Sequence, residues 1–135
     1  MASDVERTLG RAVRRLLALQ RPDGWWVGEL ESHVTMTPQH LLLLEFLRLR
    51  DEETTRRCAN ELLARQRPDG LWAIYWGGEP DLAATLESYA ALRLAGLSAD
   101  DERLAPARRF CEDHGGIGGA RVFTRIWLAL FGLWP

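Results

Sequence analysis

The sequence predicts an all-α protein of three helical hairpins that form part of an α/α barrel. Leu is abundant whereas Val and Ile together number eight, and apolar residues recur at helical rather than alternating spacing. The segment Gln20–Trp26 recurs 46 residues later as Gln66–Trp72, which indicates a series of similar units. We expect one partial barrel domain over residues 1–135, with units at about 4–49, 50–96 and 97–133.

The first helix of each unit is predicted at about 4–19, 52–65 and 100–112. Each carries a narrow apolar stripe opposite charged residues, which is typical of an outer helix with one solvated face. Pro106 lies inside the third of these ranges, so that helix either begins there or bends. The acidic run 100–102 is interpreted as its solvated first turn, and the run 51–53 as the first turn of the second outer helix.

The second helix of each unit is predicted at about 38–49, 82–95 and 121–133. Their sequences are apolar on nearly every side, so these inner helices are expected to be buried. Thr37 and Pro38 predict the start of the first one, Asp81 caps the second and Gly96 ends it. The chain stops just after its most apolar helix with no polar capping unit, which suggests a partial chain or one that needs a partner.

The repeated segment is predicted to be a structural turn between outer and inner helix. Gly24 and Gly70 supply a backbone conformation that other residues adopt poorly. Gln20 and Gln66 can bond unpaired backbone groups at helix ends, and the indoles of the aligned tryptophans, Trp26 and Trp72, can stack on these amides. The alternative function is an aromatic platform for carbohydrates or bases. The third copy is degenerate, because Glu112 replaces the Gln and no Trp follows Gly116.

This pattern resembles the glutamine–tryptophan repeat of triterpene cyclases. Further segments follow in the order found at the N-terminus of bacterial squalene–hopene cyclases: Val34-Thr35-Met36, Gly77 to Leu82, Gly115-Gly116-Ile117 and Arg121 to Arg125. The resemblance covers nearly the whole chain. It departs from the family at Arg15 and Glu61, where the repeat often carries an aromatic residue.

The resemblance implies the N-terminal part of a class II terpene cyclase, related in fold to protein prenyltransferases, that converts squalene to hopene without a cofactor. The complete enzyme would be cytoplasmic and attached to the inner membrane face. Its chemistry starts with a protonated Asp in an Asp-x-Asp-Asp motif, which this sequence lacks. We therefore expect no catalytic residue here and no activity from this chain alone.

The resemblance places one stretch beside the substrate cavity. It implies that Arg121, Phe123, Arg125 and Trp127 bind the isoprenoid hydrocarbon. Phe123 and Trp127 are one helical turn apart and could line an apolar pocket together. The alternative is an ordinary core position. Arg121 and Arg125 are expected to pair with acidic groups of segments outside this chain.

Other chemistries find little support. A net charge of −2 argues against nucleic-acid binding, and the N-terminus is no secretory signal. The three histidines, His33, His40 and His114, lack metal-ligand spacing, and the Gly-rich stretch 115–119 fits no dinucleotide loop and is expected to be a loose turn. Cys58 and Cys111 are expected to be buried thiols without a disulfide.

Two alternative functions remain open at this point. The chain could be a stand-alone helical-repeat module whose inner face binds a partner or forms a homo-oligomer, or one chain of a split cyclase completed by a second chain. Another α/α-barrel enzyme would need zinc ligands or a facing pair of carboxylates, and neither is apparent.

Overall fold

The computed structural model describes residues 3–28 and 31–135, which divide into two compact units, Met1–Glu31 and Ser32–Pro135. The described residues are all helical apart from loops and one isolated bridge between Ala73 and Pro80. The predicted fold class is therefore confirmed. How the first predicted hairpin packs against the others stays a prediction.

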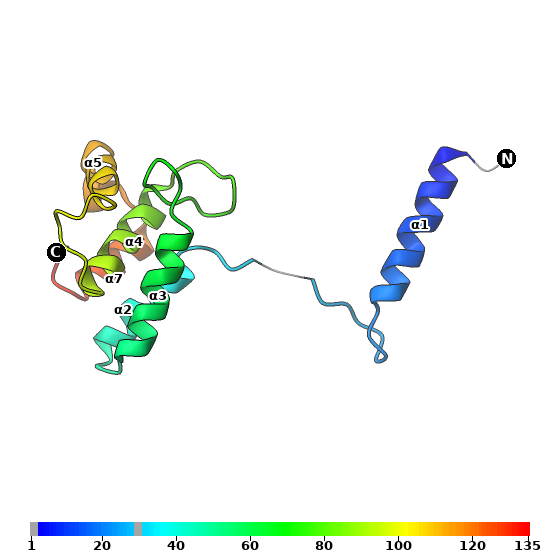
Figure 1. Ribbon diagram of the computed structural model, residues 1–135, viewed down its shortest axis with the longest axis horizontal. Helices are drawn as coiled ribbons and strands as arrows, with labels where there is room; N and C mark the ends of the chain where they lie inside the picture. The colour runs from blue at the N-terminus through cyan, green and yellow to red at the C-terminus, as the bar shows by residue number, and fades with distance from the viewer. Residues whose placement is uncertain (1–2, 29–30) are drawn as a thin grey trace. The chain divides into compact units, whose positions relative to one another are not determined.

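The first unit consists of α1 (Asp4–Leu19) followed by a turn (Figure 1). Ser3 and Glu6 form a capping box at the start of α1, which satisfies two backbone donors. The predicted apolar stripe is present, but it is solvent-exposed within this unit, with Val5, Leu9, Val13 and Leu16 each 45% exposed or more.

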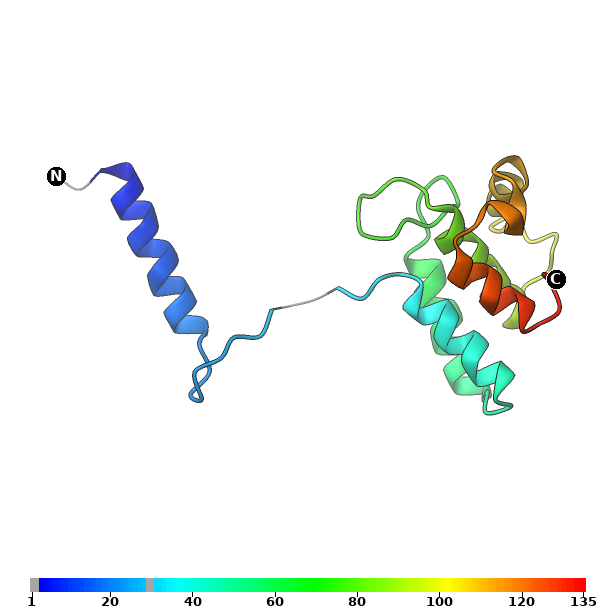
Figure 2. The same cartoon turned by 180° about the vertical axis from the view of Figure 1, so that it is seen from behind.

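The second unit contains α2 (Met36–Phe46), α3 (Glu52–Ala64), α4 (Leu82–Leu94), α5 (Ala105–Asp113), α6 (Gly116–Gly119) and α7 (Val122–Ala129). Helix α4 packs against each of the other five helices. In Figure 2, α2 and α7 lie in front, and in Figure 1 α3 lies in front. The core is built around Leu41, Leu62, Trp72, Leu92 and Leu104, all fully buried.

Several predicted boundaries were wrong. Helix α2 begins at Met36 with Thr35 as its N-cap, so Pro38 lies inside the first turn. Helix α5 begins at Ala105 with Pro106 in its first turn, where a missing N–H costs no hydrogen bond. The acidic run 100–102 therefore precedes the helix. The Gly-rich stretch forms the short α6 rather than a loose turn.

The predicted burial of the inner helices was correct for α4 and wrong for α2 and α7. Only three of the eleven residues of α2 are buried. Eight of the thirteen residues of α4 are buried. In α7 only Thr124 and Leu128 are buried, while Val122, Phe123 and Ile126 are at least half exposed. No element within residues 32–135 covers that side of α7. The apolar residues on that side are therefore exposed.

Candidate functional site

The repeated turn has the same internal geometry in both copies, which we call the first repeat turn (Gln20–Trp26) and the second repeat turn (Gln66–Trp72). In each, the indole N–H of the last residue donates to a backbone carbonyl near the end of the preceding helix. Trp26 donates to Leu16 at 2.7 Å, and Trp72 donates to Leu62 at 2.8 Å. The Gln amide instead donates to the carbonyl of the glycine four residues later, at 2.7 and 2.9 Å.

The roles assigned from the sequence were therefore wrong in part. The tryptophan indole satisfies the unpaired carbonyl at the end of the preceding helix, whereas the Gln66 amide donates to the carbonyl of Arg103, just before α5, at 2.7 Å. Both glycines have the expected left-handed conformation, with φ of 92° at Gly24 and 80° at Gly70. Trp72 is fully buried, so no sugar or base can stack on its ring. Trp26 is 49% exposed.

A buried carboxylate near the middle of α4 joins this helix to the first turns of α2 and α7. Glu87 of α4 is 1% exposed. One of its oxygens accepts a hydrogen bond from Gln39 Nε2 of α2 at 2.8 Å, and the other from the Thr124 hydroxyl of α7 at 2.5 Å. Burial raises the pKa of the Glu87 carboxyl, and the hydrogen bonds from Thr124 and Gln39 offset part of that rise.

This cluster was missed in the sequence, where Glu87 stands inside an apolar helix. An ionisable residue on the buried side of a helix was the available signal, because such groups are rarely buried without partners. A carboxyl with a raised pKa and a dedicated set of donors is a candidate functional group.

Arg121 lies beside this cluster, at the N-cap of α7. One of its guanidinium nitrogens is 3.6 Å from Asp81 Oδ1, and Asp81 caps α4 by accepting from the Ala84 N–H at 2.7 Å. Asp81 therefore has its predicted capping role. Within this chain the loop before α4 brings Asp81 to Arg121, and pairing of Arg121 with acids outside the chain stays a prediction.

The other predicted substrate-binding residues lie along α7. Phe123 is 70% exposed, whereas Trp127 and Arg125 are partly buried. The Arg125 guanidinium carbon lies 6.0 Å from the centroid of the Trp134 ring. Its buried Nε has no hydrogen-bond partner among the described residues.

An apolar cavity of about 410 Å³ opens beside α4 and the last residues of the chain, a size suited to a small ligand. Its walls come from α2, α4, α6, α7 and the C-terminal segment: Leu42, Leu86, Tyr89, Ala90, Arg93, Leu94, Ile117, Leu128, Phe131 and Leu133. Phe123 and Trp127 are not among these lining residues. Sequence reasoning missed this cavity, although the i, i+4 spacing of Leu86, Ala90 and Leu94 was visible.

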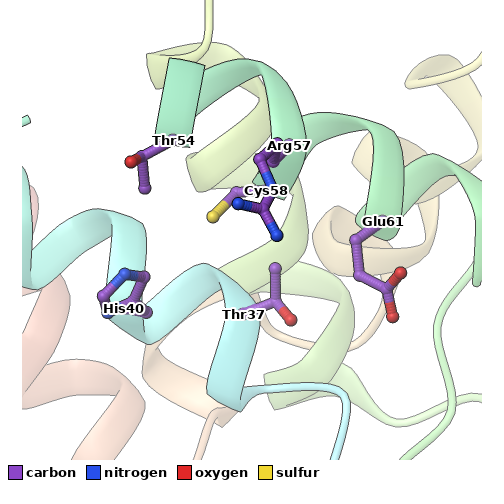
Figure 3. Close-up of a pocket in the computed structure, with 6 residues that line it drawn as sticks. All are labelled: Thr37, His40, Thr54, Arg57, Cys58 and Glu61. Atoms are coloured by element: carbon purple, nitrogen blue, oxygen red, sulfur yellow. The ribbon is translucent and has the colours of Figure 1, made fainter. Parts of the chain in front are cut away.

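A second, more polar pocket of about 520 Å³ lies between α2 and α3. Figure 3 shows the Cys58 sulfur and the His40 ring facing this space, with Arg57 and Glu61 along α3. Burial raises the pKa of Cys58, and burial raises that of Cys111 to about 12. Both cysteines are buried and free, as expected, and a protonated thiol is a poor nucleophile.

Three further properties of the described residues concern metal binding, proton donation and membrane crossing. They contain no group of three or more His, Cys, Asp or Glu side chains placed to hold a metal ion. Hydrogen bonds from Arg103 lower the pKa of Asp101 to about 2, so this carboxylate is ionised at neutral pH and is no proton donor. No helix in the described part of the chain has the length and apolar character needed to cross a bilayer.

Comparisons with a family model and with individual proteins both point to squalene-hopene cyclases. The model of the squalene-hopene cyclase N-terminal domain matches residues 9–135. Squalene–hopene cyclase of Alicyclobacillus acidocaldarius is 47% identical over 129 residues, covering 96% of this chain and 20% of the relative. The squalene–hopene cyclase of Zymomonas mobilis is 39% identical, and the match covers 98% of this chain and 20% of the length of that enzyme.

Dammaradiene synthase of Dryopteris crassirhizoma is 37% identical over 93% of this chain and 19% of its own length. The chain thus spans about a fifth of the curated relatives that it matches. It belongs to the squalene-hopene cyclase family and corresponds to the N-terminal domain region of these enzymes.

Proposed function

We propose that this chain supplies the first helical part of a class II triterpene cyclase that converts squalene, or a similar isoprenoid hydrocarbon, to a pentacyclic product. The match over residues 9–135 carries this proposal. The acid that starts the reaction comes from polypeptide outside these 135 residues, so the chain alone is inactive. The completed enzyme needs no cofactor and sits peripherally on the inner membrane face.

Within that enzyme, α7 contributes to the wall of the substrate cavity. Phe123 is exposed on a helix whose apolar side has no cover within residues 32–135, so its ring is available to an apolar substrate. Aromatic faces stabilise carbocations in a dry cavity. Trp127 lies one turn further along the same face. Arg121 and Arg125 lie on the opposite side of the helix from these rings, and Arg121 is held by Asp81.

A chimera tests the proposal. The first fifth of the Alicyclobacillus enzyme is replaced by this chain, and squalene conversion is followed by gas chromatography with mass detection. We expect hopene from the chimera and none from this chain alone. A folded chimera without product would contradict the proposed function, and product from the isolated chain would contradict its dependence on an external acid.

Substrate contact by α7 is tested in the same chimera. Phe123→Ala is expected to lower kcat/KM or change the product ratio with little change in melting temperature, because the side chain is 70% exposed here. Val122→Ala is the matched control, since Val122 is 54% exposed on the same helix but about 100° away around its axis. Equal effects of the two substitutions would count against a substrate contact.

A further inference from the structure

The polar pocket between α2 and α3 is built from side chains of both helices. It has a volume of about 520 Å³ and is lined by Thr37 and His40 of α2 and by Thr54, Arg57, Cys58 and Glu61 of α3. Figure 3 shows the Arg57 guanidinium and the Cys58 sulfur on the α3 side of this space, with Thr37 and His40 on the α2 side. Both helices belong to the second unit, residues 32–135, so a single compact unit determines the shape of the pocket.

Three of these side chains have no partner in the described part of the chain. The guanidinium of Arg57, the ring of His40 and the hydroxyl of Thr37 make no hydrogen bond and no ion pair with another described residue. Arg56, the preceding residue of α3, is by contrast paired with Glu53 at 2.7 Å. Arg57 therefore retains its whole set of N–H donors for a ligand, and His40 and Thr37 each retain a donor.

The charge at this pocket is positive, because its acidic lining residue is already paired. Glu61 accepts a hydrogen bond from Arg65 Nε at 2.5 Å, so the charge of Arg57 is not compensated by Glu61. Burial raises the pKa of the Cys58 thiol, and the charge of Arg57 offsets part of that rise. The opposite effect of the Asp51 charge on the same thiol is smaller. The pocket therefore favours an anion over a cation.

We propose that the pocket between α2 and α3 binds the phosphate group of a phosphate monoester. Arg57 approaches from one helix and His40 and Thr37 from the other, which suits a tetrahedral oxyanion better than a planar carboxylate with two oxygens. Thr37 lies in the first turn of α2, where the helix dipole also favours negative charge. Phosphate alone would fill only part of the 520 Å³, so the organic part of the ester occupies the remaining volume.

Binding is measured by titrating the full chain with sn-glycerol 3-phosphate at constant pH and ionic strength and following the backbone amide chemical shifts by NMR. We expect saturable changes confined to residues 37–40 and 54–61. Arg57→Ala should weaken binding at least about tenfold, because it removes the unpaired guanidinium. Since Arg57 is exposed, this substitution should leave the midpoint of urea unfolding unchanged. Arg56→Ala is the matched control and should leave the affinity unchanged, because Arg56 is already paired with Glu53.

Two further titrations decide the chemistry and the source of the ligand. Acetate at the same concentration should not produce these shift changes, and an equal response to acetate would overturn the assignment to phosphate. Vesicles of phosphatidylcholine with and without phosphatidate test whether the phosphate can belong to a lipid. Binding to the phosphatidate vesicles that is lost in Arg57→Ala identifies a lipid headgroup, whereas binding of glycerol 3-phosphate without vesicle binding identifies a soluble ester.

Three results would overturn the site itself. The first is the absence of saturable binding of glycerol 3-phosphate, and the second is an equal effect of Arg56→Ala and Arg57→Ala. The third is binding by the isolated chain that is lost in the chimera described above, because the rest of the enzyme would then cover the pocket. Phosphate binding here is independent of cyclase activity, which is measured separately as hopene formation.

Discussion

Trp72→Phe is expected to destabilise the second unit strongly. The substitution removes the indole N–H that donates to the Leu62 carbonyl at 2.8 Å, and both residues are fully buried. An unsatisfied buried acceptor lowers the free energy of unfolding by about 1–3 kcal/mol. The smaller phenyl ring leaves a cavity, which lowers it by about 1–2 kcal/mol more. We therefore expect a loss of about 3 kcal/mol in the free energy of unfolding.

Trp26→Phe is the matched control, because the same substitution removes the equivalent hydrogen bond to Leu16 at 2.7 Å. Trp26 is 49% exposed and Leu16 is 55% exposed, so water can replace the lost donor and the cost should stay below about 1 kcal/mol. Urea unfolding followed by far-UV circular dichroism measures both. With a slope of about 2 kcal/mol per molar urea, Trp72→Phe should lower the midpoint by about 1.5 M.

Equal midpoint shifts for the two substitutions would refute this reasoning, since the difference is attributed entirely to burial. A shift of less than about 0.3 M for Trp72→Phe would refute it as well.

Three further predictions follow from the same contacts. Gly70→Ala should lower the free energy of unfolding in urea by at least about 1 kcal/mol more than Gly24→Ala. Both glycines have positive φ, but only at Gly70 would the added Cβ lie 2.8 Å from the Cγ of Pro106; equal costs would contradict this. Glu87→Gln should flatten the pH dependence of stability. Burial raises the folded-state pKa of Glu87 above 4.5, so wild-type stability falls as pH rises from about 4.5 through the folded value, and thermal melts across this range would detect the change. Cys111 is buried and its pKa is raised to about 12, so it should react with iodoacetamide at neutral pH only when urea unfolds the chain; rapid labelling of Cys111 in the native chain would argue against its burial.

The repeat made much of the local structure predictable. Period and spacing identified the helices at α1, α3 and α4 to within a residue or two, since capping residues and glycines act through neighbouring backbone groups. The start of α5 was less predictable because acidic residues in a loop and in a first helical turn have the same sequence pattern. Asp101 pairs with Arg103 in a loop instead of capping a helix.

The candidate site was harder to predict, because its contacts join residues far apart in the chain. Glu87 and Gln39 are 48 positions apart and Glu87 and Thr124 are 37 apart, and no local pattern relates them. The pairing of Arg121 with Asp81 likewise depends on the loop that brings the start of α4 to the start of α7. In contrast, Phe123 and Trp127 could be linked from spacing alone, since they are one helical turn apart.

The linear order of residues was by itself sufficient to establish an all-helical, repeating chain of the cyclase family, because helical periodicity, glycine turns and the Gln–Trp motif are local. Only the tertiary structure decided that the indole satisfies the end of the preceding helix, and that α4 is enclosed while one side of α7 stays open. These outcomes depend on which surfaces meet in space and on the hydrogen bonds that burial makes obligatory.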